Sequence, residues 1–157
     1  MKPFRRLTHG PGETRALGAF LGRRLAPGDV LALEGELGSG KTEFVQGLAQ
    51  GLEVPPEVPV SSPSFSLVHE YPGRVTLVHI DLYRLERVPP ELMPDLEEYL
   101  SGPQVAAVEW ARRLAELLPP DHLEVRLEMA GETGRSFTFI AHGPRSRQLV
   151  AELEKEG

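Results

Sequence analysis

The sequence has no cysteine, and this absence excludes disulfide bonds, thiolate metal sites and cysteine nucleophiles. No apolar stretch comes near the ~18 residues that a membrane-spanning helix requires, so we expect no contact with a membrane. No apolar signal region follows the charged N-terminus at 1–6, and we therefore expect a cytoplasmic protein.

Basic charge is also scarce, because 3 Lys and 14 Arg stand against 23 acidic residues, for a net charge of −6. A broad nucleic-acid-binding surface needs clustered Lys and Arg, so this balance argues against one. We expect any contact with RNA to be made through a partner. At 157 residues, of which 40% are hydrophobic, the chain fits a single domain spanning 1–157. A chain of this length buries roughly two-thirds of its unfolded surface.

A glycine-rich segment at 35–42, Gly-Glu-Leu-Gly-Ser-Gly-Lys-Thr, follows directly after the apolar run at 30–33. Its glycines allow the backbone to turn tightly and to point successive N–H groups inward, toward a polyphosphate. Lys41 adds a cation for the β and γ phosphates, and the Thr42 hydroxyl is a ligand for Mg²⁺. The pattern and its position after a strand and before a helix predict a nucleotide site of the P-loop type.

The hydrophobic pattern predicts both helices and strands. Apolar residues at helical spacing indicate helices at 14–25, 41–52, 89–100 and 146–155, with a short one after 110. Strand-like runs are found at 30–33, 66–71, 75–82, 105–108, 123–129 and 136–141. Turn signals at 72–73 and 131–134 join two pairs of these runs into hairpins. The mixture of strand-helix units and hairpins predicts an α/β three-layer domain of the P-loop NTPase kind, with a mixed, partly parallel sheet.

Two acids, Asp81 and Glu109, stand where apolar strands leave the predicted sheet. In an open sheet, ligands collect at the carboxyl ends of the strands, so both acids are placed to face Thr42. A nucleoside triphosphate with Mg²⁺ needs such carboxylates to organise the metal and the attacking water. The alternative is that each is a surface acid that caps a helix or pairs with Arg84 or Arg112.

Three further features carry weaker signals. The loop at 61–66, Ser-Ser-Pro-Ser-Phe-Ser, offers hydroxyls that could fold over a γ phosphate and sense it, although Ser-Pro clusters are usually plain loops. His69 and His79 occupy strand positions, where a structural role is more common than a catalytic one. Trp110, beside Glu109, is either a core residue or a contact for a nucleotide or partner.

Five blocks of this sequence follow the order and spacing of the TsaE (YjeE) family, which the chain resembles from about 35 to 110. The blocks are 35–42, 62–71, 79–85, 96–100 and 108–110. The sequence departs from the family pattern in two places. Ser64 and Ser66 stand where the family usually has Thr, and Met93-Pro94-Asp95 stands where the family usually has a Gly.

The resemblance implies a small bacterial ATPase needed for the threonylcarbamoyladenosine modification at position 37, next to the anticodon, of tRNAs that read codons beginning with A. It implies ATP and Mg²⁺ as cofactors, with ADP as the product. It also implies docking to a complex of TsaB and TsaD, whose repeated turnover is supported by ATP hydrolysis. The tRNA would be reached only indirectly, through that complex.

Carried over by position, the resemblance implies that Lys41, Asp81 and Glu109 are catalytic and that Thr42, Asp81 and Glu109 hold the metal. The implied nucleotide-binding residues are Glu36, Leu37, Gly38, Ser39, Gly40, Lys41, Thr42, Glu43 and Trp110. We expect the Glu36 side chain itself to point to solvent. The division of roles between Asp81 and Glu109 stays open at this point.

Two other functions compete with a partner-activated ATPase. One is a nucleotide-dependent binding switch in which turnover is incidental. The other is a small-molecule kinase, for which Arg112-Arg113, the only adjacent Arg pair after the loop, is thin support. We expect slow hydrolysis by the lone chain because no arginine is clearly placed as a finger for the γ phosphate. Arg84, near Asp81, is a candidate either for that role or for contact with a partner.

Overall fold

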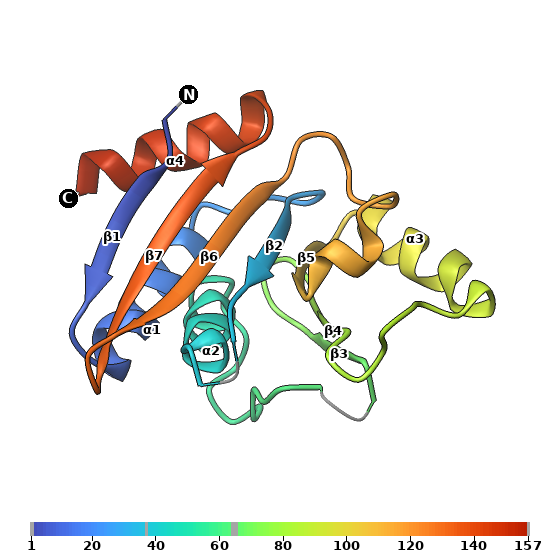
Figure 1. Ribbon diagram of the computed structural model, residues 1–157, viewed down its shortest axis with the longest axis horizontal. Helices are drawn as coiled ribbons and strands as arrows, with labels where there is room; N and C mark the ends of the chain where they lie inside the picture. The colour runs from blue at the N-terminus through green and yellow to red at the C-terminus, as the bar shows by residue number, and fades with distance from the viewer. Residues whose placement is uncertain (1, 37, 64–65, 157) are drawn as a thin grey trace.

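The computed structural model describes residues 2–36, 38–63 and 66–156 and contains a seven-stranded sheet with helices on both faces (Figure 1). The strands are β1 (Phe4–Thr8), β2 (Val30–Glu34), β3 (Val68–Tyr71), β4 (Leu77–Asp81), β5 (Val105–Glu109), β6 (Leu123–Ala130) and β7 (Gly134–Ala141). The helices are α1 (Pro11–Gly22), α2 (Lys41–Gly51), α3 (Met93–Ser101) and α4 (Pro144–Glu156), with short 3₁₀ turns η1 (Pro90–Leu92) and η2 (Ala111–Leu114).

The strand order is β1-β7-β6-β2-β5-β4-β3, so the sheet is mixed, as predicted. The central strand β2 pairs in parallel with both β5 and β6, and β5 pairs in parallel with β4. The remaining pairs, β3 with β4, β6 with β7 and β1 with β7, are antiparallel. Both predicted hairpins are confirmed. The carboxyl ends of β2, β4 and β5 therefore meet at one edge of the sheet.

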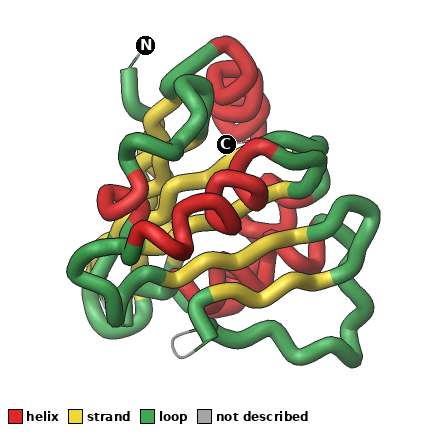
Figure 2. The backbone as a smooth tube through the Cα atoms, turned by 90° about the vertical axis from the view of Figure 1, so that its right-hand side faces the viewer, coloured by secondary structure: helices red, strands yellow, loops and turns green. Residues whose placement is uncertain are grey.

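Two hydrophobic cores make the three layers. One core lies between the sheet and helices α1, α2 and α4, and its largest buried side chains include Phe44, Phe137 and Phe139. The other lies between β2, β5 and β4 and the segment of α3, η1 and η2. Helical segments accordingly lie on both sides of the strands when the molecule is viewed from the side (Figure 2). Among the described residues, no α-helix covers the outer faces of β1, β7 and β6 (Figure 1).

Helices α1 and α2 pack backbone against backbone through glycines spaced four residues apart on each helix. Gly18 and Gly22 of α1 face Gly47 and Gly51 of α2. A Cβ atom added at Gly47 would overlap the carbonyl oxygen of Arg15, and one added at Gly18 would lie 3.0 Å from the Cα of Gly47. Only glycine permits this approach, so these positions fix how α2 sits in the domain.

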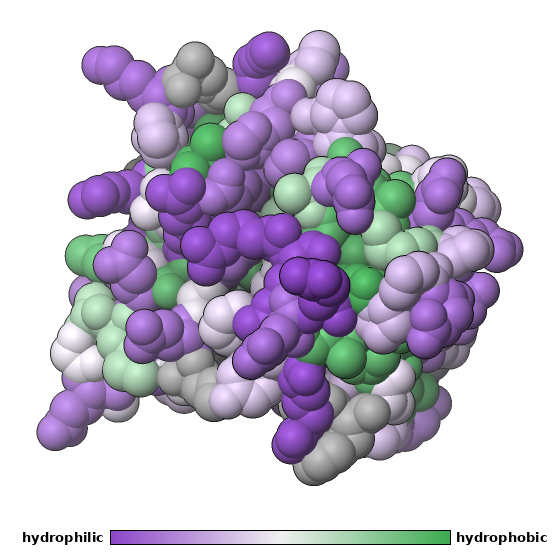
Figure 3. Space-filling view, turned by 45° about the vertical axis from the view of Figure 1, so that its right-hand side comes forward, coloured by the Kyte–Doolittle hydropathy of each residue, from purple (hydrophilic) through white to green (hydrophobic). Residues whose placement is uncertain are grey.

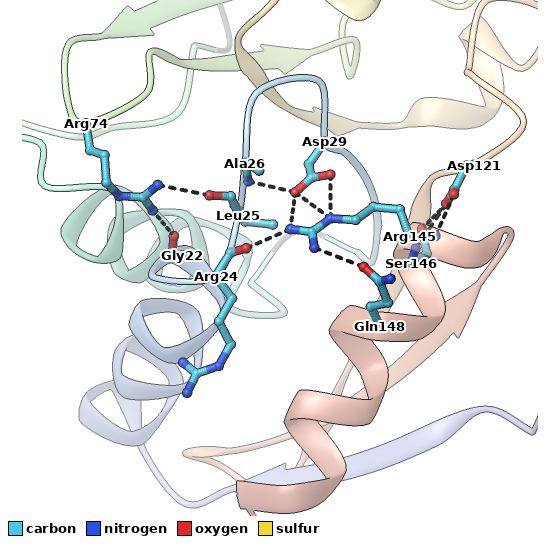
Figure 4. Close-up of polar contacts among 10 residues, drawn as sticks. All are labelled: Gly22, Arg24, Leu25, Ala26, Asp29, Arg74, Asp121, Arg145, Ser146 and Gln148. Atoms are coloured by element: carbon cyan, nitrogen blue, oxygen red, sulfur yellow. Dashed lines mark hydrogen bonds and ion pairs between the residues drawn. The ribbon is translucent and has the colours of Figure 1, made fainter.

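At the opposite edge of the sheet, a polar network fixes the start of β2 (Figure 4). The Arg145 guanidinium at the beginning of α4 donates to both carboxylate oxygens of Asp29, at 3.1 and 2.9 Å, and to the Arg24 carbonyl at 2.7 Å. Asp29 also accepts from the Ala26 N–H at 2.8 Å. The Asp121 carboxylate accepts from the backbone N–H groups of Arg145 and Ser146 at 2.8 and 3.1 Å. This network ties α4 to the turn that precedes the central strand.

The predicted elements are confirmed with small shifts in their bounds. The helix predicted at 14–25 begins at Pro11 and ends at Gly22, and Gly28 lies in the turn before β2 with φ of +93°. The departure at 93–95 begins α3, with proline in its first turn. Strand β1 was not predicted. No helix in the described ranges is long and apolar enough to cross a membrane.

Candidate functional site

The glycine-rich loop at 35–42 connects the end of β2 to the start of α2, as predicted. Gly38 and Gly40 have φ of +82° and +101°, a left-handed conformation that side chains rarely adopt. A Cβ atom at Gly35 would lie 2.7 Å from the Ser39 hydroxyl oxygen and 2.8 Å from the Leu127 carbonyl oxygen. The glycines are therefore required by conformation and by space. Glu36 is exposed, as expected, and Leu37 lies outside the described residues.

Lys41, the first residue of α2, is buried, with only 6% of it exposed. Its Nζ donates to the Gly35 carbonyl at 2.5 Å and lies 3.4 Å from Glu109 Oε1. The ammonium also sits 4.9 Å from the centroid of the Trp110 ring. A buried cation costs free energy unless it is paired, and these contacts compensate for that cost. They hold the Lys41 charge against the inner side of the glycine-rich loop.

Asp81 and Glu109 stand directly opposite each other at the ends of the neighbouring parallel strands β4 and β5. Each is 4% exposed, so neither is the surface acid that the alternative interpretation required. Asp81 accepts from the Tyr83 backbone N–H at 2.9 Å and from the Ser62 hydroxyl at 3.0 Å. Arg112, a partner considered for these acids, instead pairs with Glu34 at 3.5 Å.

His79 joins the site through Glu109, a contact that the sequence did not reveal. Its Nε2 lies 2.5 Å from Glu109 Oε2, and the histidine is 1% exposed. Burial alone would raise the pKa of the Glu109 carboxyl. The hydrogen bond from His79 and the charges of His79 and Lys41 outweigh that effect, and the pKa is lowered. The period-two alternation of a strand was the available signal, since it places residues 79 and 81 on one face of β4.

Four buried polar side-chain atoms at or near the loop have no hydrogen-bond partner among the described residues, namely Ser39 Oγ, Trp110 Nε1, His79 Nδ1 and Arg135 Nε. Buried polar atoms are nearly always bonded in folded proteins, so such atoms indicate a place for a ligand or water. Thr42 and Glu43 follow in the first turn of α2 and are half-buried. The loop, its lysine and the first turn of α2 thus form a cradle that fits an anion at a helix N-terminus.

Trp110 belongs both to the second core and to the surroundings of Lys41. Its φ of +60° is rare for a bulky residue, and it directs the chain from β5 into η2. The ring lies 5.5 Å from that of Tyr83, and the Arg113 guanidinium lies 5.0 Å from its centroid. Arg113 in turn donates to the carbonyls of Leu82 and Tyr83 at 2.6 and 2.9 Å. The interpretation of Trp110 as a core residue is therefore supported, and its contact with a nucleotide or partner stays a prediction.

The loop predicted to act as a sensor is partly within the described residues, because Ser64 and Phe65 lie outside them. Ser62 reaches Asp81 through the hydrogen bond already described, and Leu67 accepts from the Asp81 N–H at 2.9 Å. Leu67 itself has φ of +70°, unusual for a leucine. The loop is thus attached to the strand-end acid from both sides.

Arg135 of β7 is a further basic residue at the loop, and the sequence analysis did not find it. Its Nη2 donates to the Gly38 carbonyl at 3.1 Å. No motif marks it, because 97 residues separate the two partners. The chain folds Arg135 onto the loop through the β6–β7 hairpin.

A hollow of about 1040 Å³ adjoins the loop on the outer side of β6. Gly35, Glu36 and Ser39 line its inner end, and a stacked pair, His122 and His142, lines its far wall with ring centroids 4.4 Å apart.

In the space-filling view hydrophilic side chains cover much of the molecule, and hydrophobic ones gather on its right-hand side (Figure 3). The exposed large hydrophobic residues of the described chain are Leu7, Tyr83 and Met129.

Comparison with known proteins places this fold and loop in one family. Residues 8–137 match the model of the family described as threonylcarbamoyl adenosine biosynthesis protein TsaE. The chain belongs to the TsaE family. The relative named tRNA threonylcarbamoyladenosine biosynthesis protein TsaE from Bacillus subtilis (strain 168) is 40% identical to it over 156 residues, which cover 99% of this chain and 96% of the relative.

Two further proteins, one compared by sequence and one by structure, support membership of the TsaE family. The protein of the same name from Nostoc sp. (strain PCC 7120) is 43% identical over 145 residues, covering 88% of this chain and 86% of the relative. The crystal structure of YdiB from Bacillus subtilis superposes with a TM-score of 0.84 at 37% identity, covering 99% of this chain and 96% of that one. The fold is therefore the P-loop NTPase-like fold expected from the sequence.

Proposed function

We propose that this TsaE-family protein binds ATP with Mg²⁺, hydrolyses it to ADP, and thereby supports a TsaB and TsaD complex in forming N6-threonylcarbamoyladenosine. The modified base would be at position 37 of tRNAs that read codons beginning with A. The observation that carries the proposal is the buried Lys41, held between the Gly35 carbonyl and Glu109 at the start of α2. A buried ammonium at a glycine-rich helix N-terminus suits a polyphosphate. The names of the relatives support the pathway.

The residues present fit a Mg²⁺ ion that arrives with the nucleotide. Magnesium in such sites takes one or two carboxylates, a hydroxyl and phosphate oxygens, and it keeps several waters. Thr42, Glu109 and Asp81 offer the hydroxyl and two carboxylates at the end of the loop. In the described part of the chain no three His, Asp or Glu side chains form a site by themselves, which is consistent with an ion that needs the phosphates. The ion would neutralise charge on the phosphates.

The two acids have different surroundings, and this difference supports a division of roles. Glu109 touches Lys41 and His79, has a lowered pKa, and is therefore ionised and ready to serve as a metal ligand. Asp81 holds Ser62 and the turn after β4, so it is suited to a metal-linked water or to the sensor loop. Lys41 would bind phosphate oxygens. Trp110 and the backbone of 36–43 would complete the nucleotide site.

We propose slow hydrolysis by the chain alone. Arg113 is occupied by the carbonyls of Leu82 and Tyr83, and Arg112, which lines the hollow beside the loop, pairs with Glu34. A partner that supplies or repositions an arginine would raise the rate by several orders of magnitude. With a net charge of −6, the chain would meet tRNA only through its partner complex, and this assembly would be cytoplasmic.

The proposal is tested by calorimetric titration of the purified protein with ATP and ADP, with and without Mg²⁺, together with hydrolysis assays with and without TsaB and TsaD. We expect binding of both nucleotides, a low rate alone and a higher rate with the partners. Replacing Lys41 by Ala should remove binding, whereas replacing the exposed Arg5 by Ala should not. A wild-type protein that binds neither nucleotide contradicts the proposal. An Arg84→Ala variant with unchanged basal and stimulated rates excludes both roles considered for Arg84.

A second function is favoured by the bond between Ser62 and Asp81, since it joins the loop after α2 to the acid of β4. If nucleotide acts mainly through this loop, the protein is a binding switch in which ATP sets affinity for the partner. Partner affinity measured with ATP, ADP and a non-hydrolysable analogue separates the two functions. A switch should keep its function in an Asp81→Asn variant that still binds ATP and still accepts the hydrogen bond from Ser62, and an ATPase should lose it.

A further inference from the structure

Arg135 extends from β7 to the back of the glycine-rich loop. Within the sheet it lies opposite Thr8 of β1 and Met129 of β6. By strand alternation it shares a face with Phe137 and Phe139, whose rings belong to the core beneath α2. The guanidinium donates to three backbone carbonyls, those of Gly38 at 3.1 Å, Gly134 at 2.7 Å and Glu132 at 3.4 Å. One cation thus joins the β6–β7 hairpin to the loop.

The hydrogen bond from Arg135 to the Gly38 carbonyl restrains a glycine peptide, which has no side chain to limit its rotation. Gly38 has φ of +82°, and its carbonyl belongs to the same planar peptide as the Ser39 N–H. That N–H donates to the Glu36 carbonyl at 3.1 Å, so the peptide is held at both ends. Without Arg135 the carbonyl end would be held by no contact from β7, and the peptide would be freer to rotate.

The same side chain packs on the next glycine of the loop. A Cβ atom at Gly40 would lie 3.4 Å from both Cγ and Nε of Arg135. Gly40, with φ of +101°, is also the N-cap residue directly before α2. Arg135 therefore contacts the two glycines on either side of Ser39, in the part of the loop that leads into the N-terminus of α2.

Among the described residues, Arg135 is bonded to carbonyls and not to a carboxylate, and Glu43 lines the same small cavity as its side chain. Within residues 2–36, 38–63 and 66–156, no carboxylate forms an ion pair with it, and its buried Nε has no hydrogen-bond partner. A guanidinium whose neighbours are carbonyls keeps its positive potential at the loop. Such a potential favours binding of an anion, the more so because the site is partly shielded from water.

The β6–β7 hairpin, which carries Arg135, is held in place by contacts with neighbouring elements. Thr133 donates from its hydroxyl to the His9 carbonyl at 3.3 Å, which joins the hairpin to the turn between β1 and α1. Beneath it the hydroxyls of Thr8 and Thr14 are bonded at 2.7 Å. Only a cavity of about 20 Å³ remains between this turn, the hairpin and the start of α2. Arg135 is therefore presented from a supported element.

We propose that Arg135 is a positioning residue that holds the Gly38 carbonyl, and with it the turn of the loop before α2, in place and adds positive potential for the nucleotide phosphates. This role rests on the proposed binding of ATP and ADP. It assigns the β6–β7 hairpin a part in nucleotide affinity, although the hairpin lies outside the glycine-rich loop and the strand-end acids.

The test compares Arg135→Met, which keeps an unbranched stem, with Arg135→Lys, which keeps the charge but cannot bond several carbonyls in one plane. Arg5→Ala, on the outer face of the neighbouring β1, is the matched control. Dissociation constants for ADP and ATP are measured with Mg²⁺. Loss of a hydrogen bond from a charged group predicts about 10- to 100-fold weaker binding in Arg135→Met, with an intermediate value for Arg135→Lys. The control should remain within about threefold of wild type.

A second readout needs no nucleotide. Amide hydrogen exchange in the peptide 35–43 of the free protein should be faster in Arg135→Met than in wild type, while exchange in β4 and β5 should be unchanged. If exchange and affinity both equal those of wild type, Arg135 has no positioning role, and the proposed ATPase function still stands. If Arg135→Met loses protection throughout the chain, the residue acts in folding and the proposal is wrong. A wild-type protein that binds no nucleotide overturns both proposals.

Discussion

His79 Nε2 and Glu109 Oε2 lie 2.5 Å apart beneath the glycine-rich loop, and both side chains are almost fully buried. The two residues come from neighbouring parallel strands, β4 and β5. The other oxygen of Glu109 faces Lys41. The Glu109 carboxylate is thus held between a lysine and a histidine, with each of its oxygens in contact with one of them.

Replacing His79 by Leu should lower the free energy of unfolding by about 1–3 kcal/mol, because Glu109 loses a hydrogen bond in a buried place. His79→Gln, which keeps an N–H donor, should lose less. Urea denaturation of both variants measures the difference, with the exposed His9→Ala as the control. Equal stabilities for the Leu and Gln variants would show that the contact with Glu109 contributes nothing.

Replacing Glu109 by Gln should reduce ATP hydrolysis by about 100-fold or more, because a neutral amide is a poor magnesium ligand. Binding of ATP without Mg²⁺ should change much less. Single-turnover hydrolysis and Mg²⁺ titrations of nucleotide affinity measure the two effects. A variant that hydrolyses ATP at the wild-type rate with the same Mg²⁺ dependence would remove Glu109 from the metal site.

Replacing Gly47 by Ala should lower the free energy of unfolding by about 2–3 kcal/mol, because the new methyl group meets the Arg15 carbonyl across the α1 and α2 contact. Gly12→Ala is the matched control, since no atom lies within 4 Å of the new Cβ. Alanine is the better helix former, so this control should be unchanged or more stable by up to about 1 kcal/mol. Thermal and urea unfolding of the pair decide whether the close approach is real.

Acid should weaken the anchoring of α4 through Asp121. Partial burial opposes ionisation of this carboxyl, but the hydrogen bonds from Ser146 and Arg145 outweigh it and lower its pKa below the ordinary 3.8. A lowered folded-state pKa contributes stability above the unfolded pKa, and this stability is lost as the pH falls through the folded value. The Asp121→Asn variant should thus be less stable at pH 7 and show a shallower loss of stability below about pH 5. Parallel curves for the two proteins between pH 7 and 2 would exclude this role.

The sequence predicted the elements that carry local signals. Apolar spacing and turn residues predict the strand at 30–33, the helix after Lys41 and both hairpins. The two acids at strand ends were identified because ligands bind at the carboxyl ends of parallel strands. Strand β1 was missed because Arg6, an inward-facing position, is polar. It donates to the Leu153 carbonyl at 3.1 Å and pairs with Glu156 at 3.3 Å, both on α4. These partners of the Arg6 side chain lie on α4, at the far end of the sequence, so no local pattern of residues reveals them.

The parts of the site that the sequence did not predict all depend on distant pairing. The sequence favoured a structural role for His79 and did not indicate its contact with Glu109. A histidine in a strand does not reveal which residue lies beside it on the next strand. Arg135 belongs to a hairpin with no recognisable motif, and its contact with the Gly38 carbonyl forms only when the chain is folded. Pairwise contacts of this kind need the register of the sheet, and composition and spacing do not supply it.

The glycine contacts between α1 and α2 leave the two helices no room to slide past each other. If the loop binds a nucleotide as proposed, we expect any accompanying rearrangement to spare this helix pair and to involve other segments, such as the one where Ser62 bonds to Asp81. The α1–α2 pair would then act as a rigid support for the glycine-rich loop.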